Sequence, residues 1–171
     1  AYSKDILGIT AKKEYDVITI GLSDGNDRKG INYFRKVRAK RVEVSNYDGA
    51  DYKFMSLPRR KVYELIASSH FYLALSHSEG FGLPVMESMV LGVPVIYVDC
   101  HAFHEYAMGI SIPAREEGYW CVYDFKDVQE AVNYALGMGK EEYYDLSAKV
   151  REYALRRFDP DVIYKKVLSF V

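Results

Sequence analysis

Short apolar runs alternate along this chain with segments in which apolar residues recur every three or four positions. The run at 15–21 (YDVITIG) is continuous, rich in β-branched residues and closed by a glycine, which is typical of a strand buried on both faces. The runs at 71–75 (FYLAL) and 93–98 (VPVIYV) have the same character. Shorter runs at 41–44 and 51–55 predict two further strands.

Between and after these runs, the apolar spacing changes to that of a helix. Residues 30–40 place Ile31, Phe34 and Val37 on one side, and Pro58 opens a helical segment that extends to residue 69. The remaining predicted helices lie at 84–91, over 128–135, from about residue 141 and from residue 160 onward. Strands that alternate with helices of about ten residues predict an α/β fold, in which one parallel sheet lies between two helical layers.

Such a sheet binds its ligands beyond the carboxyl ends of the strands. Three loops follow predicted strands at that edge, at 22–30, 76–83 and 99–105. The second contains Gly80 and Gly82, beside which a ligand can approach the backbone closely. The helix that follows turns its positive dipole end toward the same crevice, so this loop is a candidate phosphate site.

Two carboxylates, Glu79 and Glu87, flank this loop with seven residues between them. Because a helical side chain leans toward the helix N-terminus, Glu87 returns its carboxylate to the loop mouth. There it is placed to accept hydrogen bonds from both hydroxyls of a ribose. Either acid alone has an ordinary explanation, as a loop acid or as a first-turn acid stabilised by the helix dipole. Together they suit a ligand with hydroxyls at both ends and a diphosphate between, which describes a nucleotide sugar.

The composition of the chain excludes several classes of protein. The 171 residues suit one domain over 1–171, and a net charge of -1 gives no electrostatic footprint for nucleic acid. A run of about 18 apolar residues, as a membrane span requires, is absent from the sequence. The two cysteines, Cys100 and Cys121, are expected to form no disulfide, which predicts a reducing, cytoplasmic location. The scarcity of glutamine indicates a thermophilic source.

Residues 76–96 (SHSEGFGLPVMESMVLGVPVI) closely resemble the signature of family-4-type retaining glycosyltransferases of the GT-B architecture. The family pattern is S-x-x-E-G-F-G-L-P-x-x-E-A-x-x-x-G-x-P-V-I, and Ser88 replaces its usual alanine. The matching positions are Ser76, Glu79, Gly80, Phe81, Gly82, Leu83, Pro84, Glu87, Gly92, Pro94 and Val95. Arg28-Lys29-Gly30 resembles the family's basic element after the first strand. The resemblance extends over most of the chain and weakens after about Glu105.

This resemblance implies a Rossmann-like domain that forms the C-terminal, donor-binding half of a GT-B enzyme. It assigns the catalytic roles to three residues, with Lys29 and Arg28 on the donor diphosphate and Glu79 on the sugar. It assigns donor binding to Gly80, Phe81, Gly82, Leu83, Pro84, Val85, Glu87, Met55 and Ser56. The implied substrate is a nucleoside-diphosphate sugar, and neither a cofactor nor a metal is expected.

Two features depart from the family pattern or compete with it. Leu22 occupies the place where the family usually has an arginine, so the cationic clamp must rest on Lys29 with help from Arg28 or another cation. The cluster Asp99, Cys100, His101, His104 and Glu105 is rich in possible zinc ligands, but it lacks the second ligand pair of a structural site.

Residues 1–15 resemble the family's interdomain segment, and residues 156–171 are expected to form a C-terminal helix. We therefore expect an acceptor-binding N-terminal domain, in the same chain or in a partner, without which this domain transfers no hexose. Peripheral association with a membrane would come through that other half, and no nucleic-acid partner is expected. Two alternatives stay open, a non-catalytic nucleotide-sugar-binding module and a nucleotide-sugar epimerase of the same architecture.

Overall fold

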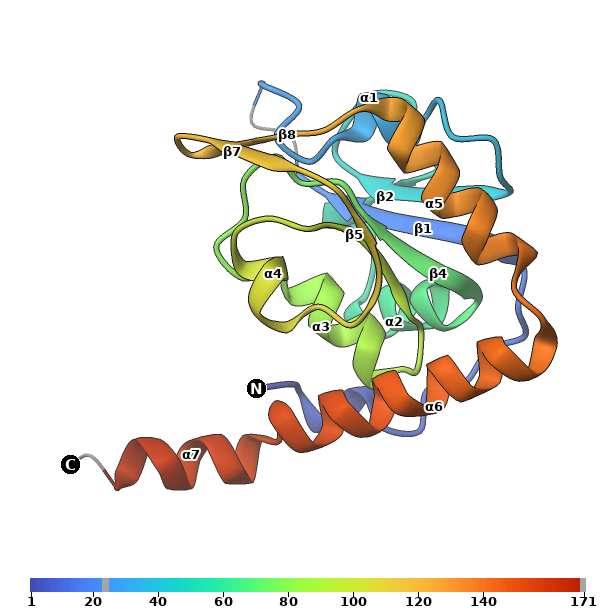
Figure 1. The fold of residues 1–171 in the computed structure, drawn as a ribbon. Coiled ribbons are helices and arrows are strands. Elements are labelled where there is room, and N and C mark those ends of the chain that lie inside the picture. Colours follow the sequence, from blue (N-terminus) through green and yellow to red (C-terminus); the bar gives the residue numbers. More distant parts are fainter. Residues whose placement is uncertain (23–24, 170–171) are drawn as a thin grey trace.

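A six-stranded parallel sheet lies at the centre of the described chain, which comprises residues 1–22 and 25–169 (Figure 1). Its spatial order is β3-β2-β1-β4-β5-β6. The strands are β1 (Tyr15–Gly21), β2 (Arg41–Ser45), β3 (Tyr52–Lys53), β4 (Ser69–Ala74), β5 (Val95–Val98) and β6 (Gly109–Ile112). The chain winds outward in one direction from β1 to β3 and in the other from β4 to β6. The switch point between β1 and β4 is where such sheets open a crevice for ligands.

Successive strand residues face opposite layers of the core, as the pleat of a strand requires. Val17 packs in one apolar cluster and Ile18 in the other, and both are fully buried. One face is covered by α1 (Ile31–Phe34) and α5 (Phe125–Gly137). The other is covered by α2 (Arg59–Ala67), α3 (Leu83–Val90), α4 (Ala102–Tyr106) and α6 (Lys140–Arg157). The expected α/β fold, a Rossmann-like domain with a parallel sheet between helices, is confirmed.

The N-terminal segment lies beside the end of α6 (Figure 1). The amide of Tyr2 donates to the carbonyl of Phe158 (3.2 Å), just after α6, and Ile6 from the short helix η1 (Lys4–Ile6) is buried in the core. The last helix, α7 (Pro160–Leu168), begins at a side-chain cap, where Asp159 accepts from the amide of Asp161 (2.8 Å). Of the helices in the described residues, none is long and apolar enough to cross a membrane.

The helix predicted over 30–40 is wrong in length, because α1 ends at Phe34. Beyond it, the amide of Val37 donates to Phe34 in a tight three-residue turn. Such a turn repeats every three residues, so it buries Ile31, Phe34 and Val37 together without a continuous α-helix. The spacing correctly predicted the buried side and overestimated the helix. The strand predicted over 51–55 is likewise only β3, followed by the 3₁₀ turn η2 (Phe54–Ser56).

The segment between β5 and α5 holds elements that the apolar pattern did not predict. They are α4, β6 and a hairpin of β7 (Arg115–Glu117) and β8 (Trp120–Val122). Each is five residues or fewer, too short to show a period. The hairpin brings Cys121 back to Cys100, and the two form a disulfide with a Cα–Cα distance of 6.3 Å. The expectation of unpaired cysteines was therefore wrong, because their contact depends on a hairpin that links positions 21 residues apart.

Candidate functional site

A cleft of about 790 Å³ opens at the carboxyl end of β1, beside the loop that follows β4. Its walls come from the ends of β1 and η2 and from the starts of α2 and α3. Nine of the predicted site residues line it: Arg28, Lys29, Met55, Glu79, Phe81, Gly82, Leu83, Pro84 and Glu87. Ser56, Gly80 and Val85 are not among its lining residues, and Val85 is buried on the core side of α3. Three loops and turns that are distant in sequence therefore meet at one cavity.

Lys29 and Glu79 form an ion pair that joins the loop after β1 to the loop after β4. Both side chains are largely buried, with exposed fractions of 17% and 14%. The hydroxyl of Ser76 also approaches the same Glu79 oxygen, at 3.4 Å. Gly30 adopts φ 66°, and a Cβ there would lie 2.3 Å from the carbonyl oxygen of Leu75. Only glycine lets the backbone after Lys29 come this close to β4, so Gly30 positions the lysine for the pair.

Arg28 forms a second connection between the same loops. Its Nη1 donates to the carbonyl of Ser78 (3.0 Å), and its own carbonyl accepts from the amide of His77 (2.7 Å). Leu22, where the family pattern has arginine, lines the cleft with 42% of its surface exposed. Residues 23 and 24 of the predicted loop 22–30 fall outside the described residues. An apolar side chain therefore stands where a cation was expected.

The start of α3 is held by its glycine. Gly82 adopts φ 80°, and a Cβ there would lie 2.6 Å from the ring of Phe103. The hydroxyl of Tyr106 donates to the carbonyls of Phe81 and Gly82, which holds the turn before α3 in place. By contrast, a Cβ on Gly80 would meet open space. Burial raises the pKa of Tyr106, so its hydroxyl remains a donor.

The carbonyl of Gly82 accepts from the amides of Val85 (3.0 Å) and Met86 (3.4 Å). This turn uses two of the first-turn amides that the sequence suggested for an anion. The positive end of the α3 dipole still faces the cleft through Gly82 and Leu83, which line it.

Glu87 lines the cleft with only 8% of its surface exposed. Its Oε1 accepts from Arg59 Nη2 (3.0 Å) and from the hydroxyl of Tyr63 (3.2 Å), both on α2. The bond to Glu87 raises the pKa of Arg59, while burial and the charge of Glu87 raise that of Tyr63. A carboxylate held by a guanidinium and a phenol is fixed in place, with Oε2 making no hydrogen bond to residues 1–22 or 25–169.

Arg59 and Tyr63 were not predicted from the sequence as site residues. A signal was present, because Arg59 follows the helix-opening Pro58 and Tyr63 lies four residues later on the same helical face. Arg59 lines the cleft with its side chain 62% exposed. It is thus a third cation of the cleft, beside Lys29 and Arg28.

The candidate metal cluster of the loop after β5 is divided in the structure. His104 Nδ1 pairs with Asp99 Oδ1 at 2.8 Å, which raises the pKa of His104, and Glu105 is exposed. Cys100 and His101 instead turn toward Cys121 on β8. These residues lie outside the set that lines the cleft.

Comparison with known proteins identifies a family for this chain. The family model for glycosyl transferases group 1 matches residues 52–156, more than half of the chain. "Putative glycosyltransferase ORF330" of Acidianus filamentous virus 2 is 45% identical over 94% of this chain and 56% of its own length. "Putative glycosyltransferase 41" of a Sulfolobus islandicus filamentous virus is 37% identical over 84% of the chain and 48% of its own length. The chain thus spans about half the length of the curated relatives it matches.

Solved structures agree on the fold. The C-terminal domain of a group 1 glycosyl transferase (LpcC) from Francisella tularensis superposes with a TM-score of 0.62 at 14% identity, over 87% of this chain and 89% of that domain. Anabaena HepE, solved in complex with UDP and glucose, gives 0.67 at 15% identity over 90% of this chain and 47% of its own. This chain therefore belongs to the glycosyl transferases group 1 family, and its domain has the GT-B, Rossmann-like fold.

Proposed function

We propose that this chain is the donor-binding half of a retaining glycosyltransferase, which transfers a hexose from a nucleoside-diphosphate sugar to an acceptor held by another domain. The observation that carries the proposal is the pair of fixed carboxylates on two walls of one cleft. Glu79 is paired with Lys29 on one wall, and Glu87 is paired with Arg59 on the other. HepE, a structural neighbour, is also described in complex with UDP-glucose.

In this proposal, Glu87 accepts hydrogen bonds from the ribose through Oε2, the oxygen that Arg59 and Tyr63 leave available. The diphosphate lies between the α3 dipole and the cations Lys29 and Arg28. These groups stabilise the negative charge that develops on the leaving diphosphate, so the transfer needs no metal. Glu79 orients the sugar, while its bond to Lys29 keeps the ammonium directed along the cleft.

The retaining course follows from the family resemblance. The acceptor hydroxyl attacks the anomeric carbon from the side on which the diphosphate departs, and the leaving diphosphate accepts the acceptor's proton. The sugar passes through an oxocarbenium-like state, and we assign its stabilisation to the carboxylate of Glu79, which lines the cleft. Glu79 is thus proposed as a catalytic residue together with Lys29 and Arg28.

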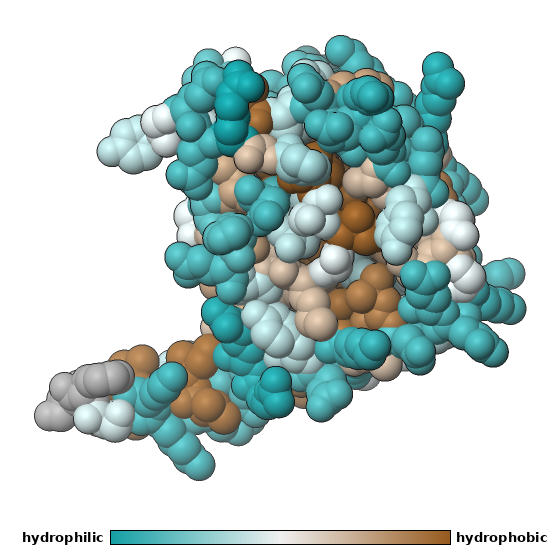
Figure 2. Space-filling model, viewed as in Figure 1, coloured by the Kyte–Doolittle hydropathy of each residue, from teal (hydrophilic) through white to brown (hydrophobic). Residues whose placement is uncertain are grey.

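A second domain is part of the proposal, because the curated relatives are about twice as long as this chain. The C-terminal helix α7 supports it. This helix projects away from the body of the domain, and apolar groups are visible on its surface (Figures 1 and 2). Val162, Tyr164, Val167 and Leu168 are all more than half exposed. Exposed apolar side chains on a projecting helix are suited to packing against another domain.

We also propose a cytoplasmic site of action and a thermophilic source. The disulfide does not oppose a cytoplasmic location, because intracellular proteins of hyperthermophilic archaea are rich in disulfides. The viral relatives come from Acidianus and Sulfolobus hosts, which are hyperthermophiles.

The test compares the full-length gene product with residues 1–171 in two assays. Calorimetry with uridine, guanosine and adenosine diphosphates should show binding to both proteins. Sugar transfer from the matching donor to an acceptor pool should occur only with the full-length protein. Positioning two substrates lowers a reaction barrier by about 7–11 kcal/mol, so loss of the acceptor wall should abolish turnover while donor binding survives. Robust transfer by residues 1–171 would contradict the half-enzyme proposal.

Leu22 is the one observation that favours a different function, a non-catalytic nucleotide-sugar-binding module. With a cation missing from the diphosphate end, such a module would bind the donor without activating the leaving group. Full-length protein that binds nucleotide but neither transfers nor hydrolyses the sugar would support that alternative.

A further inference from the structure

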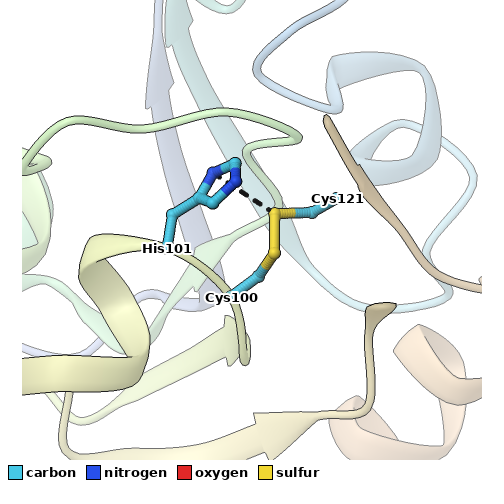
Figure 3. Close-up of side chains that lie close together, drawn as sticks. All are labelled: Cys100, His101 and Cys121. Carbon is cyan, nitrogen blue, oxygen red and sulfur yellow. Dashed lines mark hydrogen bonds between the residues drawn. A yellow bond between two sulfur atoms is a disulfide. The ribbon is translucent and has the colours of Figure 1, made fainter. Parts of the chain in front are cut away.

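Cys100, His101 and Cys121 place three metal-binding atoms within 4.8 Å of one another (Figure 3), and none of the three lines the cleft. The ring of His101 is directed at the two sulfur atoms, with Nδ1 3.4 Å from Cys121 Sγ. Cys100 follows β5 and Cys121 lies on β8, so the three donors come from two separate segments of the fold. The proposed sugar transfer in the cleft gives this cluster no role.

A carboxylate, that of Glu116, lies beside the cluster. Glu116 Oε1, on β7, lies 3.8 Å from Cys100 Sγ and accepts from the backbone amide of His101 (3.2 Å). It also lies 4.0 Å from His101 Nε2, the ring nitrogen that faces away from the sulfur atoms. A carboxylate beside the outer nitrogen of a metal-ligating histidine fixes the ring and its tautomer. Glu116 is in position to do this for His101.

One ligand distance already matches that of a tetrahedral zinc site. With Zn–S of about 2.3 Å and Zn–N of about 2.0–2.1 Å, the donors of such a site are about 3.4–3.8 Å apart. The 3.4 Å between His101 Nδ1 and Cys121 Sγ lies in that range. A Cα–Cα distance of 6.3 Å lets the two sulfur atoms share one metal after side-chain rotation alone.

Burial and backbone conformation agree with a built site. Cys100 and Cys121 are 4% and 1% exposed, whereas the Glu116 side chain is 59% exposed and leaves an entry from solvent. His101 adopts φ 51° and ψ −135°, a conformation that a residue with a side chain rarely takes. The surrounding structure therefore holds His101 in an unfavourable conformation that directs its ring at the sulfur atoms.

We propose that this cluster is a thiol-dependent zinc site, with Cys100, His101 and Cys121 as ligands and Glu116 orienting His101. A dithiol reductant opens the disulfide: two electrons and two protons pass to the sulfur atoms, and the reductant leaves as its own disulfide. Zn²⁺ then binds the two thiolates and displaces their two protons. In the oxidised protein the disulfide links Cys100 and Cys121, and in the reduced protein the bound metal links them.

In both the disulfide-bonded and the metal-bound state, the cluster would anchor β8, which contacts the loop after β4. The amide of Cys121 donates to the carbonyl of His77 (2.6 Å), and His77 Nδ1 contacts the carbonyl of Cys121 (2.7 Å). The amide of His77 in turn donates to the carbonyl of Arg28 (2.7 Å). The site thus supports the loop that carries Glu79 in both redox states.

The test uses the 171-residue chain, reduced with a phosphine under argon and titrated with Co²⁺ and then with Zn²⁺. One equivalent of Co²⁺ should give a thiolate-to-cobalt charge-transfer band and the strong visible absorption of tetrahedral Co²⁺, and one equivalent of Zn²⁺ should remove both. The oxidised protein should give neither signal. A reduced protein that shows only the weak spectrum of aqueous Co²⁺ would overturn the proposal.

Variants identify the ligands. Cys121→Ser should weaken the charge-transfer band of the bound metal, because it removes one of the two thiolate ligands, and Glu116→Gln should weaken Zn²⁺ binding by about 10–100-fold, the usual effect of losing such a partner. His101→Ala should weaken it at least as much. His104→Ala is the matched control, because His104 pairs with Asp99 and should leave the affinity unchanged. Circular dichroism confirms folding, and a folded His101→Ala protein that binds Zn²⁺ like the wild type would refute the site.

Discussion

Arg59 Nη2 lies 3.0 Å from Glu87 Oε1, so the carboxylate assigned to the ribose is joined to a helix that the sequence analysis had not connected with the site. The hydroxyl of Tyr63 donates to the same oxygen. Together they fix one oxygen of Glu87 and direct the other at the cleft. This arrangement makes Glu87, which lies one turn into α3, an oriented acceptor.

Replacing Glu87 with alanine should weaken nucleotide binding by about 1–3 kcal/mol, the usual effect of losing charge-assisted hydrogen bonds. Isothermal calorimetry with the three nucleoside diphosphates measures the change. Glu64→Ala is the matched control, because it also removes an acid that pairs with an arginine, at a partly exposed position of α2 outside the cleft. Unchanged affinity in Glu87→Ala would reduce Glu87 to a structural partner of Arg59.

Replacing Glu79 with alanine should affect sugar-bearing donors far more than the bare diphosphate. The substitution removes the proposed contact with the sugar but also releases Lys29, whose ammonium becomes fully available to the diphosphate. Affinity for the nucleoside diphosphate should therefore stay constant or rise, while that for the nucleotide sugar falls. Equal losses for both ligands would contradict the assignment of Glu79 to the sugar end.

Leu22→Arg should tighten diphosphate binding, because a charge-assisted hydrogen bond contributes about 1.5–3 kcal/mol where water is partly excluded. Leu7→Arg is a close control, since Leu7 has the same exposed fraction of 42% and does not line the cleft. Competition calorimetry at low salt compares the two variants. If neither changes the affinity, another cation already occupies that corner, and Arg28 and Arg59 are the residues to replace next.

Removing the disulfide should lower the free energy of unfolding by about 3 kcal/mol, the value expected for a loop of some 20 residues. Denaturant unfolding of the Cys100→Ser/Cys121→Ser double variant, in the presence of a chelator, measures this loss. Wild-type protein treated with reductant should lose the same amount. The double variant should not respond to reductant, and a response would show that reduction acts elsewhere.

Lys13 gives the protein a pH-dependent stability. Burial lowers the pKa of Lys13 from 10.5 to about 8, while its Nζ donates to the carbonyl of Ser69 (2.5 Å). Between these values the unfolded chain binds more protons than the folded one, so the free energy of unfolding should rise with pH, by about 1–3 kcal/mol. Lys13→Met should be more stable than the wild type at pH 7 and should lose this slope. Lys12→Met, at an exposed neighbour, should keep it.

The sequence by itself determined the class of the fold and the centre of the site. Continuous apolar runs such as Tyr15–Gly21 are buried on both faces, so their pattern identifies parallel strands without knowledge of their neighbours. The motif around Glu79 and Glu87 is local as well. Its spacing, its glycines and the following helix occur within a dozen residues, and Gly82 takes the positive φ that the turn requires.

Only the tertiary structure decided which partners these residues have. Arg59 meets Glu87 across 28 residues, Lys29 meets Glu79 across 50, and Cys121 returns to Cys100 through a hairpin whose strands are too short to predict. An ion pair or a disulfide between distant positions depends on how helices and loops pack, and local apolar periodicity carries no information about that. The sequence therefore identified the carboxylates of the cleft. The packing of α2, of the loop after β1 and of the β7–β8 hairpin determined what holds them in place.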